Sequence, residues 1–215
     1  MSSLIVAESG LEGLTMPALA KRLGVSAASL YKHFSSKQEL LAVLAFRVVE
    51  ELDRVLRAAI ADREAAGSWE TLAVLTGAYA ELYVQAPTTA ILMDAFIINP
   101  RELLTDRLWA PTWELMERWW SKMEALVQEL GLSREAAVRT GWLVWTTTQG
   151  ALSAGNFGSR RDLPPPEELA RQATLCLLRG AGIVSPECSD ALWVRGCTHG
   201  ALITRGILEE AAKSE

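Results

Sequence analysis

The stretch from Thr15 to Leu41 constrains the fold of this chain more than any other part of its sequence. Apolar residues recur there at three- and four-residue spacing, which predicts a short amphipathic helix. Its buried face is Met16, Leu19, Ala20 and Leu23. Gly24 supplies the backbone of a tight turn, Val25 is expected to fill the corner, and Ser26 is a good N-cap for a second helix. Two short helices joined in this way are typical of a helix-turn-helix, whose second helix enters the major groove of DNA.

A longer pattern runs through the same stretch. Its positions are Leu19-Ala20, Leu23-Gly24-Val25-Ser26, Leu30-Tyr31, His33-Phe34, Lys37 and Leu40-Leu41. They resemble the signature of the tetracycline-repressor (TetR) family of bacterial transcriptional regulators, which is roughly I-A, x-G-V-S, L-Y-x-H-F, x-x-K and x-x-L-L. The resemblance implies an all-α fold with an N-terminal three-helix helix-turn-helix DNA-binding head, residues 1–46. A larger C-terminal helical domain for ligand binding and dimerisation, residues 47–215, is expected to follow.

The beginning of the head looks short beside that family. Residues 2–9 predict a short helix that ends at Gly10. Members of the family usually have several more residues, often basic, before the equivalent of Ile5. We therefore expect an N-terminally short head with fewer contacts to the DNA backbone.

Composition narrows the class of protein further. Half of the 215 residues are apolar, yet no uninterrupted apolar run approaches the ~20 residues of a membrane span. The first residues also lack the basic region and the cleavage site of a signal peptide, so a cytoplasmic protein is expected. The net charge of −5 argues against a coat of basic charge but leaves room for a local basic patch.

The cysteines predict no metal site and no cofactor. Cys176, Cys188 and Cys197 lack metal-ligand spacing, and only His33 and His199 could join them. Small thiols, buried or in the tail, are the expected reading.

The rest of the chain predicts helices and no β-hairpin. Ser36 and Glu39 form a capping-box pattern that starts a long helix. The expected helices are 37–64, 69–85, 88–98, 105–130, 133–154, 166–180 and a short final one at 199–213, with one more segment begun by Ser185-Pro186-Glu187. The total is nine or ten helices, and whether the tail after Ser185 covers the body or a partner stays open.

Base contacts are expected from the start of the second helix of the motif. Its exposed residues are Ala27, Ala28, Ser29 and Lys32. The first three are short, so base readout would be sparse: a methyl contact, a hydroxyl hydrogen bond and one lysine. Thr15 and the exposed N–H groups of the helix after it can add a backbone contact.

Phosphate contacts are implied by the family resemblance at Tyr31, His33 and Lys37. Each has a structural alternative. Tyr31 could pack against the long helix, His33 could simply end its helix, and Lys37 could be a solvated charge. Lys37 stands at a helix start, where the helix dipole disfavours a cation, so a phosphate partner explains it better.

A small-molecule pocket is expected between the later helices. Seven of the eight tryptophans lie between Trp69 and Trp145, and buried indoles need partners for their N–H groups. The candidate lining is Tyr79, Tyr83, Met93, Phe96, Trp113, Trp142, Trp145, Thr146 and Gln149. A small, largely apolar effector would fit such walls. The alternative is that the tryptophans only fill a helical core.

One element inside this region resembles a regulatory-domain motif of the family. Trp145 to Gly150 is similar to Trp-x-x-x-His-Gly, with Gln149 in place of the histidine. A role that depends on an imidazole therefore does not carry over.

The resemblance also implies the partners. A homodimer would form through helices at about 133–155 and 166–180, where small residues permit close packing. Its two heads would read a palindromic double-stranded DNA operator in successive major grooves, ~34–36 Å apart.

The sequence disfavours two other classes of protein. An enzyme is disfavoured because the sequence has no nucleophile elbow, phosphate loop or metal cluster. A helical ligand-binding protein without DNA-binding activity is disfavoured by the Thr15–Leu41 stretch. Repression is the family's default role, and activation stays open.

Overall fold

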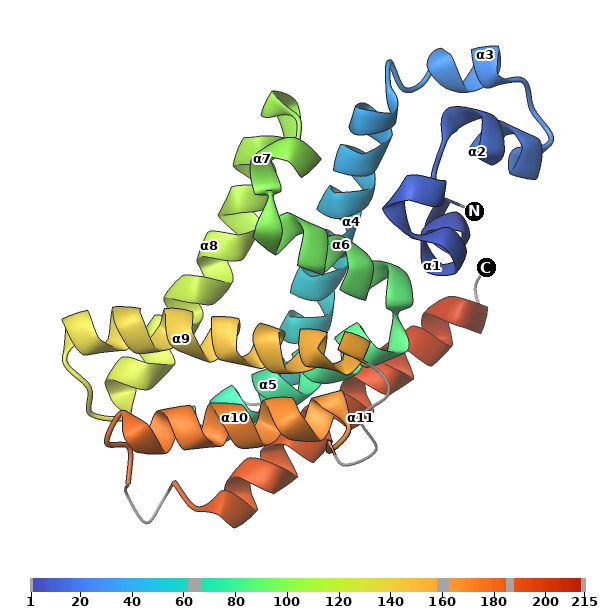
Figure 1. Ribbon diagram of the computed structural model, residues 1–215. Coiled ribbons are helices and arrows are strands. Elements are labelled where there is room, and N and C mark those ends of the chain that lie inside the picture. The colour runs from blue at the N-terminus through green and yellow to red at the C-terminus, as the bar shows by residue number, and fades with distance from the viewer. Residues whose placement is uncertain (1, 62–66, 158–162, 185–187, 214–215) are drawn as a thin grey trace. The chain divides into compact units, whose positions relative to one another are not determined.

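The computed structural model describes residues 2–61, 67–157, 163–184 and 188–213, and for residues 2–4, 7, 156 and 157 it describes the backbone alone. Within these ranges every regular element is helical and no strand is present (Figure 1), so the all-α prediction is confirmed. The elements are α1 (Ser2–Gly13), α2 (Met16–Leu23), α3 (Ala27–Tyr31), α4 (Lys37–Ile60), α5 (Ser68–Gln85), α6 (Pro87–Ile98), α7 (Pro100–Leu103), α8 (Asp106–Glu129), α9 (Arg134–Ser153), the 3-10 helix η1 (Ala154–Phe157), α10 (Pro166–Gly180) and α11 (Asp190–Lys213).

The chain divides into two compact units. The first comprises Met1–Glu51 and Ala86–Leu115, and the second comprises Leu52–Gln85 and Met116–Glu215. Helices α4 and α8 each begin in the first unit and end in the second. This division follows compactness, and the functional boundary after residue 46 stays a prediction.

The first unit is built around a small apolar core. Val6 and Leu14 are fully buried in it, and Ile91 of α6 packs against it. Gly10 has a left-handed φ of 66°, which interrupts the helical backbone of α1 at the residue where the sequence predicts an end. The core therefore joins the two parts of α1 to the helix-turn-helix and to α6.

Most helix ends lie near their predicted positions. Asn99-Pro100 does end α6, but Pro100 also begins the short helix α7, which the sequence pattern did not predict. Proline is tolerated there because the first turn of a helix needs no N–H from it. The expected end of α4 at residue 64 lies outside the described residues.

Helix α5 forms the centre of the second unit. Nearly all of its residues from Trp69 to Tyr83 are buried, as expected for a helix that is apolar on every side. Helix α11 packs along it, and two glycines permit the close approach. A Cβ added to Gly77 would lie 1.9 Å from the carbonyl oxygen of Cys197, and one added to Gly200 would lie 2.0 Å from that of Val74.

The sequence prediction that the tail forms two separate segments is wrong. Instead of a short final helix at 199–213, one continuous helix runs from Asp190 to Lys213. Residues 185–187, predicted to begin a separate segment, lie outside the described residues. Gly196 and Gly200 weaken an isolated helix, but here they are the residues that fit against α5. The tail therefore packs on a helix of its own chain.

An ion pair is a second contact that joins α5 and α11. Glu81 is only 5% exposed, and its carboxylate accepts hydrogen bonds from Arg205 at 2.8 and 2.9 Å. A buried carboxylate needs such a partner because burial disfavours its charged form. The pair therefore fixes where along α5 the tail helix docks.

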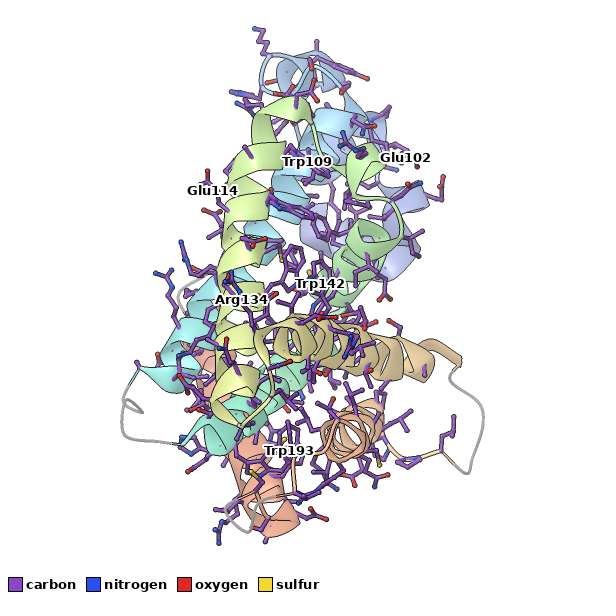
Figure 2. All side chains as sticks on the ribbon, turned by 90° about the vertical axis from the view of Figure 1, so that its left-hand side faces the viewer. Glu102, Trp109, Glu114, Arg134, Trp142 and Trp193 are labelled. Atoms are coloured by element: carbon purple, nitrogen blue, oxygen red, sulfur yellow. The ribbon has the colours of Figure 1, made fainter. Side chains whose placement is uncertain are left out.

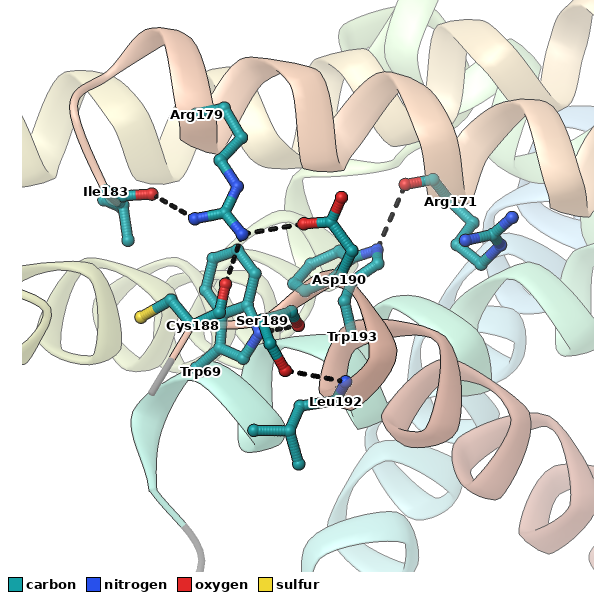
Figure 3. Close-up of polar contacts among 9 residues, drawn as sticks. All are labelled: Trp69, Arg171, Arg179, Ile183, Cys188, Ser189, Asp190, Leu192 and Trp193. Atoms are coloured by element: carbon teal, nitrogen blue, oxygen red, sulfur yellow. Dashed lines mark hydrogen bonds and ion pairs between the residues drawn. The ribbon is translucent and has the colours of Figure 1, made fainter. Parts of the chain in front are cut away.

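The turn from α10 into α11 is held by Arg179 (Figure 3). Its guanidinium donates hydrogen bonds to the carbonyl oxygens of Ile183, at 2.8 Å, and Cys188. It also pairs with Asp190 at 2.7 Å and lies over the ring of Trp69, 5.1 Å from the centroid. One side chain thus satisfies carbonyls on both sides of the turn.

Two buried indoles complete this corner. Trp69 and Trp193 pack with their ring centroids 5.0 Å apart. Their N–H groups donate to the carbonyl oxygens of Ser189 and Arg171, each at 3.1 Å (Figure 3). These two tryptophans therefore have a structural role that joins α5, α10 and α11.

Two features of the described residues bear on class. No helix among them is long and apolar enough to cross a bilayer. Cys188 and Cys197 are buried and Cys176 is exposed, all three as free thiols. Burial raises the pKa of the Cys197 thiol to about 12, so this thiol stays neutral and unreactive.

Candidate functional site

The helix-turn-helix is capped as the sequence predicts. The hydroxyl of Thr15 accepts from the N–H of Ala18 at 3.2 Å, and that of Ser26 accepts from the N–H of Ser29 at 3.1 Å. Gly24 is left-handed, with φ 67°, and its N–H bonds back to the last turn of α2. Capping hydroxyls and a left-handed glycine, all local in sequence, therefore define where α2 ends and α3 begins.

Two expectations about the turn are wrong. Val25 is 44% exposed and does not fill the corner, and Leu23 is 43% exposed although it was placed on the buried face. Leu19 and Leu30 belong to the core cluster beneath the turn instead. Helix α3 is only five residues long, so few apolar side chains are needed to close the core beneath the turn, and Leu23 and Val25 stay exposed.

The four residues expected to meet base edges differ in exposure. Ala28 and Lys32 are exposed, whereas Ala27 and Ser29 are half-buried. Ala27 packs against the apolar core of the head, so its methyl group is partly used there. Lys32 is the longest of the four side chains and is exposed, so it has the greatest reach toward a groove.

Among the three expected phosphate ligands, two are plainly accessible. Tyr31 is 52% exposed and His33 is exposed. Lys37 is half-buried, and its Nζ donates to the carbonyl oxygen of Leu11 at 2.8 Å. An ammonium group has three donors, so this bond leaves others for a phosphate. The bond joins the start of α4 to α1, a role that sequence spacing could not reveal.

A bidentate ion pair neutralises the charge of one basic residue of the head. Arg22 of α2 donates to both carboxylate oxygens of Glu8 of α1, at 2.6 and 2.7 Å. These hydrogen bonds hold the pKa of the Glu8 carboxyl below its usual value and raise that of Arg22. Lys21 and Lys32 are exposed and form no ion pair within the described part of the head. They therefore carry most of its available positive charge.

The start of α4 is fixed by the predicted capping residues. The Ser36 hydroxyl accepts from the N–H of Glu39 at 3.1 Å, while the Glu39 carboxylate accepts from Ser35 rather than from Ser36. Hydrogen bonds from Ser35 hold the pKa of the Glu39 carboxyl below its usual value, helped by the nearby charge of Arg107. Gln38 also donates to the carbonyl oxygen of Glu102. The first turn of α4 is thus attached to α7 and α8 inside the first unit.

A small apolar cavity lies inside the second unit. Its volume is about 50 Å³. Its lining is Leu52, Leu56, Leu72, Leu75, Thr76, Tyr79, Met116, Trp119, Trp120, Met123, Val144, Trp145 and Thr148. The threonine hydroxyls are already bonded: Thr76 donates to Leu72 at 2.9 Å and Thr148 to Val144 at 2.7 Å. The walls therefore offer no charged side chain and few available polar groups.

Of the nine residues predicted to bind a ligand, Tyr79 and Trp145 line this cavity. Trp142, labelled in Figure 2, stacks on the cavity residue Trp120 with their ring centroids 4.3 Å apart. Thr146 is exposed, and its hydroxyl bonds to the carbonyl oxygen of Trp142 at 3.0 Å. Met93, Phe96 and Trp113 belong to the first unit and are not among the lining residues.

Gln149 and Tyr83 take part in a polar chain between α5 and α9. The hydroxyl of Tyr79 donates to Oε1 of Gln149, whose Nε2 donates to Ser153 at 3.1 Å. Tyr83 also donates to Ser153, at 3.4 Å. The amide that replaces the histidine of the family motif therefore joins two helices and is 4% exposed.

Sequence reasoning missed one buried charge beside the cavity. Asp53 of α4 is 2% exposed and accepts from Arg118 at 2.8 Å and from the indole N–H of Trp119 at 3.1 Å. Arg57 completes the group with an ion pair at 2.5 Å. The available signal was an aspartate inside the apolar stripe formed by Leu52 and its neighbours.

Taken together, the chain is an all-α protein with a helix-turn-helix head and a helical body that contains an apolar cavity. Residues 5–44 match the sequence model of a family described as "Bacterial regulatory proteins, tetR family". The chain thus carries the helix-turn-helix of the TetR family, and the resemblance seen in the sequence is confirmed. Regulators of this family are generally non-enzymatic DNA-binding proteins.

Solved structures share the fold. The TetR-family transcriptional regulator PfmR from Thermus thermophilus is 24% identical, with a TM-score of 0.61 over 82% of this chain and 94% of that one. A protein of unknown function from Rhodococcus sp. RHA1 is 24% identical, with a TM-score of 0.65 over 83% and 90%. Mycobacterium smegmatis AmtR is 22% identical, with a TM-score of 0.61 over 93% and 88%. At these identities the likeness shows the fold alone. No match is found among curated proteins.

Proposed function

We propose that this protein is a cytoplasmic, ligand-responsive transcriptional regulator, most simply a homodimeric repressor that a small apolar effector releases from its operator. The observation that carries the proposal is the helix-turn-helix, which has the family's residues at the family's spacing. Its accessible side chains, Tyr31, Lys32 and His33, lie at and just after the end of α3.

DNA recognition in this proposal relies on phosphate contacts more than on base contacts. Ala27, Ala28 and Ser29 are short side chains that can offer a methyl contact or one hydroxyl hydrogen bond to a base edge. Thr15, Tyr31, His33 and Lys37 hold the backbone, and Lys32 reaches a base or a phosphate. Specificity then depends strongly on the spacing of the two half-sites in the dimer.

The effector in this proposal is neutral. A charged ligand transferred into walls without an available counter-charge would lose its hydration without compensation. The cavity lining contains no ionisable side chain except the Tyr79 hydroxyl, which already bonds Gln149. Effector and DNA affinity are then coupled reciprocally, typically by ~1–3 kcal/mol.

The dimer in this proposal forms through α9 and α10, which lie side by side (Figure 1). Val138, Trp142 and Leu143 of α9 are each about 40% exposed. Cys176 of α10 is exposed beside the half-buried Leu177. Exposed apolar side chains on two adjacent helices are what a self-complementary four-helix interface would cover.

Replacing Leu143 with glutamate is expected to weaken the dimer by more than ~100-fold, because a two-fold interface would bury the unpaired carboxylate twice. Sedimentation velocity over a range of protein concentrations measures this. The matched control is Val194→Glu, since Val194 of α11 is also apolar and 39% exposed but lies on neither helix. A Leu143→Glu protein that stays as dimeric as the parent would contradict the proposed interface.

The DNA-binding proposal is tested by selecting duplexes from a random pool with the purified protein. We expect enrichment of one short palindromic sequence, and tight binding of the same sequence where it occurs upstream of the protein's own gene. Selection that enriches no sequence would remove the proposed function.

A further inference from the structure

The cavity is too small for the effector it is proposed to bind. Its volume of about 50 Å³ can hold a few water molecules, whereas ligand pockets usually enclose ~300–1,000 Å³. Binding must therefore displace part of the wall. The effect on the rest of the protein then depends on which wall residue moves and on which residues are bonded to it.

The walls contributed by α8 differ in how firmly they are held. Met116 and Met123 have flexible, unbranched side chains that can change rotamer easily. Trp119 is held by the 3.1 Å hydrogen bond from its indole N–H to the carboxylate of Asp53. Trp120, the fourth wall residue of α8, stacks on Trp142 of α9. Trp119 is therefore the wall residue of α8 whose hydrogen bond would carry a displacement to α4.

The carboxylate of Asp53 lies where α4 and α8 meet. Leu52 and Leu56 line the cavity from α4, and Asp53 stands between them in the sequence. The Asp53 side chain is 3% exposed and also receives Arg118 of α8. Hydrogen bonds to a charged group are stronger than those between neutral groups, so breaking the bond to Trp119 inside this buried site is unfavourable. A movement of Trp119 is less unfavourable when Asp53, and the segment of α4 that carries it, moves too.

We propose that Asp53 is a positioning residue that transmits filling of the cavity to α4, through its hydrogen bond with Trp119. The inference rests on the proposed function, because α4 begins inside the DNA-binding head, at Lys37, and ends in the second unit. It assigns the coupling between effector and DNA to one buried carboxylate and one indole N–H.

The test uses Trp119→Phe, which keeps an aromatic wall and removes only the indole and its donor. Trp145→Phe is the matched control, since it shortens an indole of the same cavity on α9. The probe is 1-aminoanthracene, a flat neutral aromatic amine, with binding followed by its fluorescence. DNA affinity is measured by fluorescence anisotropy on the selected duplex, with and without saturating probe.

In the parent and in Trp145→Phe, the probe is expected to weaken DNA binding by roughly tenfold or more. In Trp119→Phe, the ligand-free DNA affinity should stay within about threefold of the parent. Each variant is measured at its own saturating probe concentration, and in Trp119→Phe the effect of the probe on DNA binding should fall to less than about twofold. Asp53→Asn keeps an acceptor for the indole and should retain most of the coupling, whereas Asp53→Ala should lose it. If the Asp53 variants do not fold, the Trp119→Phe comparison decides alone.

Equal probe effects in the parent and in Trp119→Phe would overturn the inference and leave the proposed function intact. A probe that does not bind the parent, or binds without changing its DNA affinity, would overturn both the effector proposal and the inference. If the parent binds no DNA, the proposed function fails, and amide hydrogen exchange in residues 52–60 still tests the connection. Probe binding should change that exchange in the parent and not in Trp119→Phe, and an identical change in both overturns the inference.

Discussion

Replacing Gly200 with alanine is expected to destabilise the protein by about 3 kcal/mol or more, although alanine is the better helix former by ~1 kcal/mol. The added Cβ would lie 2.0 Å from the carbonyl oxygen of Val74 and 2.8 Å from the amide nitrogen of Ala78. Both are backbone atoms of α5, so no side chain can rotate away and α11 must shift as a whole. Gly77→Ala should have a similar effect from the opposite helix.

Gly206 provides the control in the same helix. A Cβ at this position meets no atom within 4 Å, so Gly206→Ala should leave stability unchanged or raise it by up to ~1 kcal/mol. Urea unfolding followed by tryptophan fluorescence, at one fixed protein concentration, measures both variants. Equal stabilities for Gly200→Ala and Gly206→Ala would show that α11 does not pack on α5 as described.

Replacing Lys32 with glutamate is expected to weaken binding to the selected duplex by more than ~100-fold at 0.1 M salt. The side chain is exposed just after α3, and a dimer would carry the reversed charge at both half-sites. A carboxylate there repels the phosphates and cannot donate to a guanine edge. Fluorescence anisotropy against the selected duplex and a scrambled duplex measures the change.

Lys122→Glu is the charge-matched control. Lys122 is also exposed, but it belongs to α8 in the second unit. It makes the same change in net charge, so DNA affinity should fall by less than about threefold if contacts rather than overall charge determine binding. Equal losses for the two variants would contradict the assignment of Lys32 to the DNA surface.

Local features were predicted well because each depends on residues close in sequence. The hydroxyl caps at Thr15 and Ser26, the left-handed Gly24 and the kink at Gly10 all follow from backbone chemistry within three or four residues. The exposure of Val25 was not predicted, because it depends on tertiary packing: the core beneath the five-residue helix α3 is small and does not reach Val25.

Non-local pairings could not be predicted from periodicity. The ion pair of Glu8 with Arg22 and the bond of Trp119 to Asp53 join residues 14 and 66 positions apart. Helical spacing shows which face of a helix is apolar, but it does not name the helix that covers that face. Helix propensity alone would make Gly200 unfavourable in α11, yet its lack of a side chain is what lets the tail pack against α5.

The candidate ligand set shows the same limit. Aromatic residues in the right region of the sequence were identified, and Tyr79 and Trp145 do line the cavity. Leucines and methionines complete its walls, and nothing in their local sequence distinguishes them from other core residues. Gln149 was chosen as a polar group for a ligand, yet it is bonded within the fold to Tyr79 and Ser153.

The central claim is that this chain binds a specific DNA duplex through the phosphate contacts of its helix-turn-helix. The most direct measurement is the salt dependence of binding to the selected duplex, from 50 to 300 mM salt. Several phosphate contacts per head predict a slope of log affinity against log salt of roughly −4 or steeper for the dimer. A slope near zero, or equal affinity for selected and scrambled duplexes, would contradict the account.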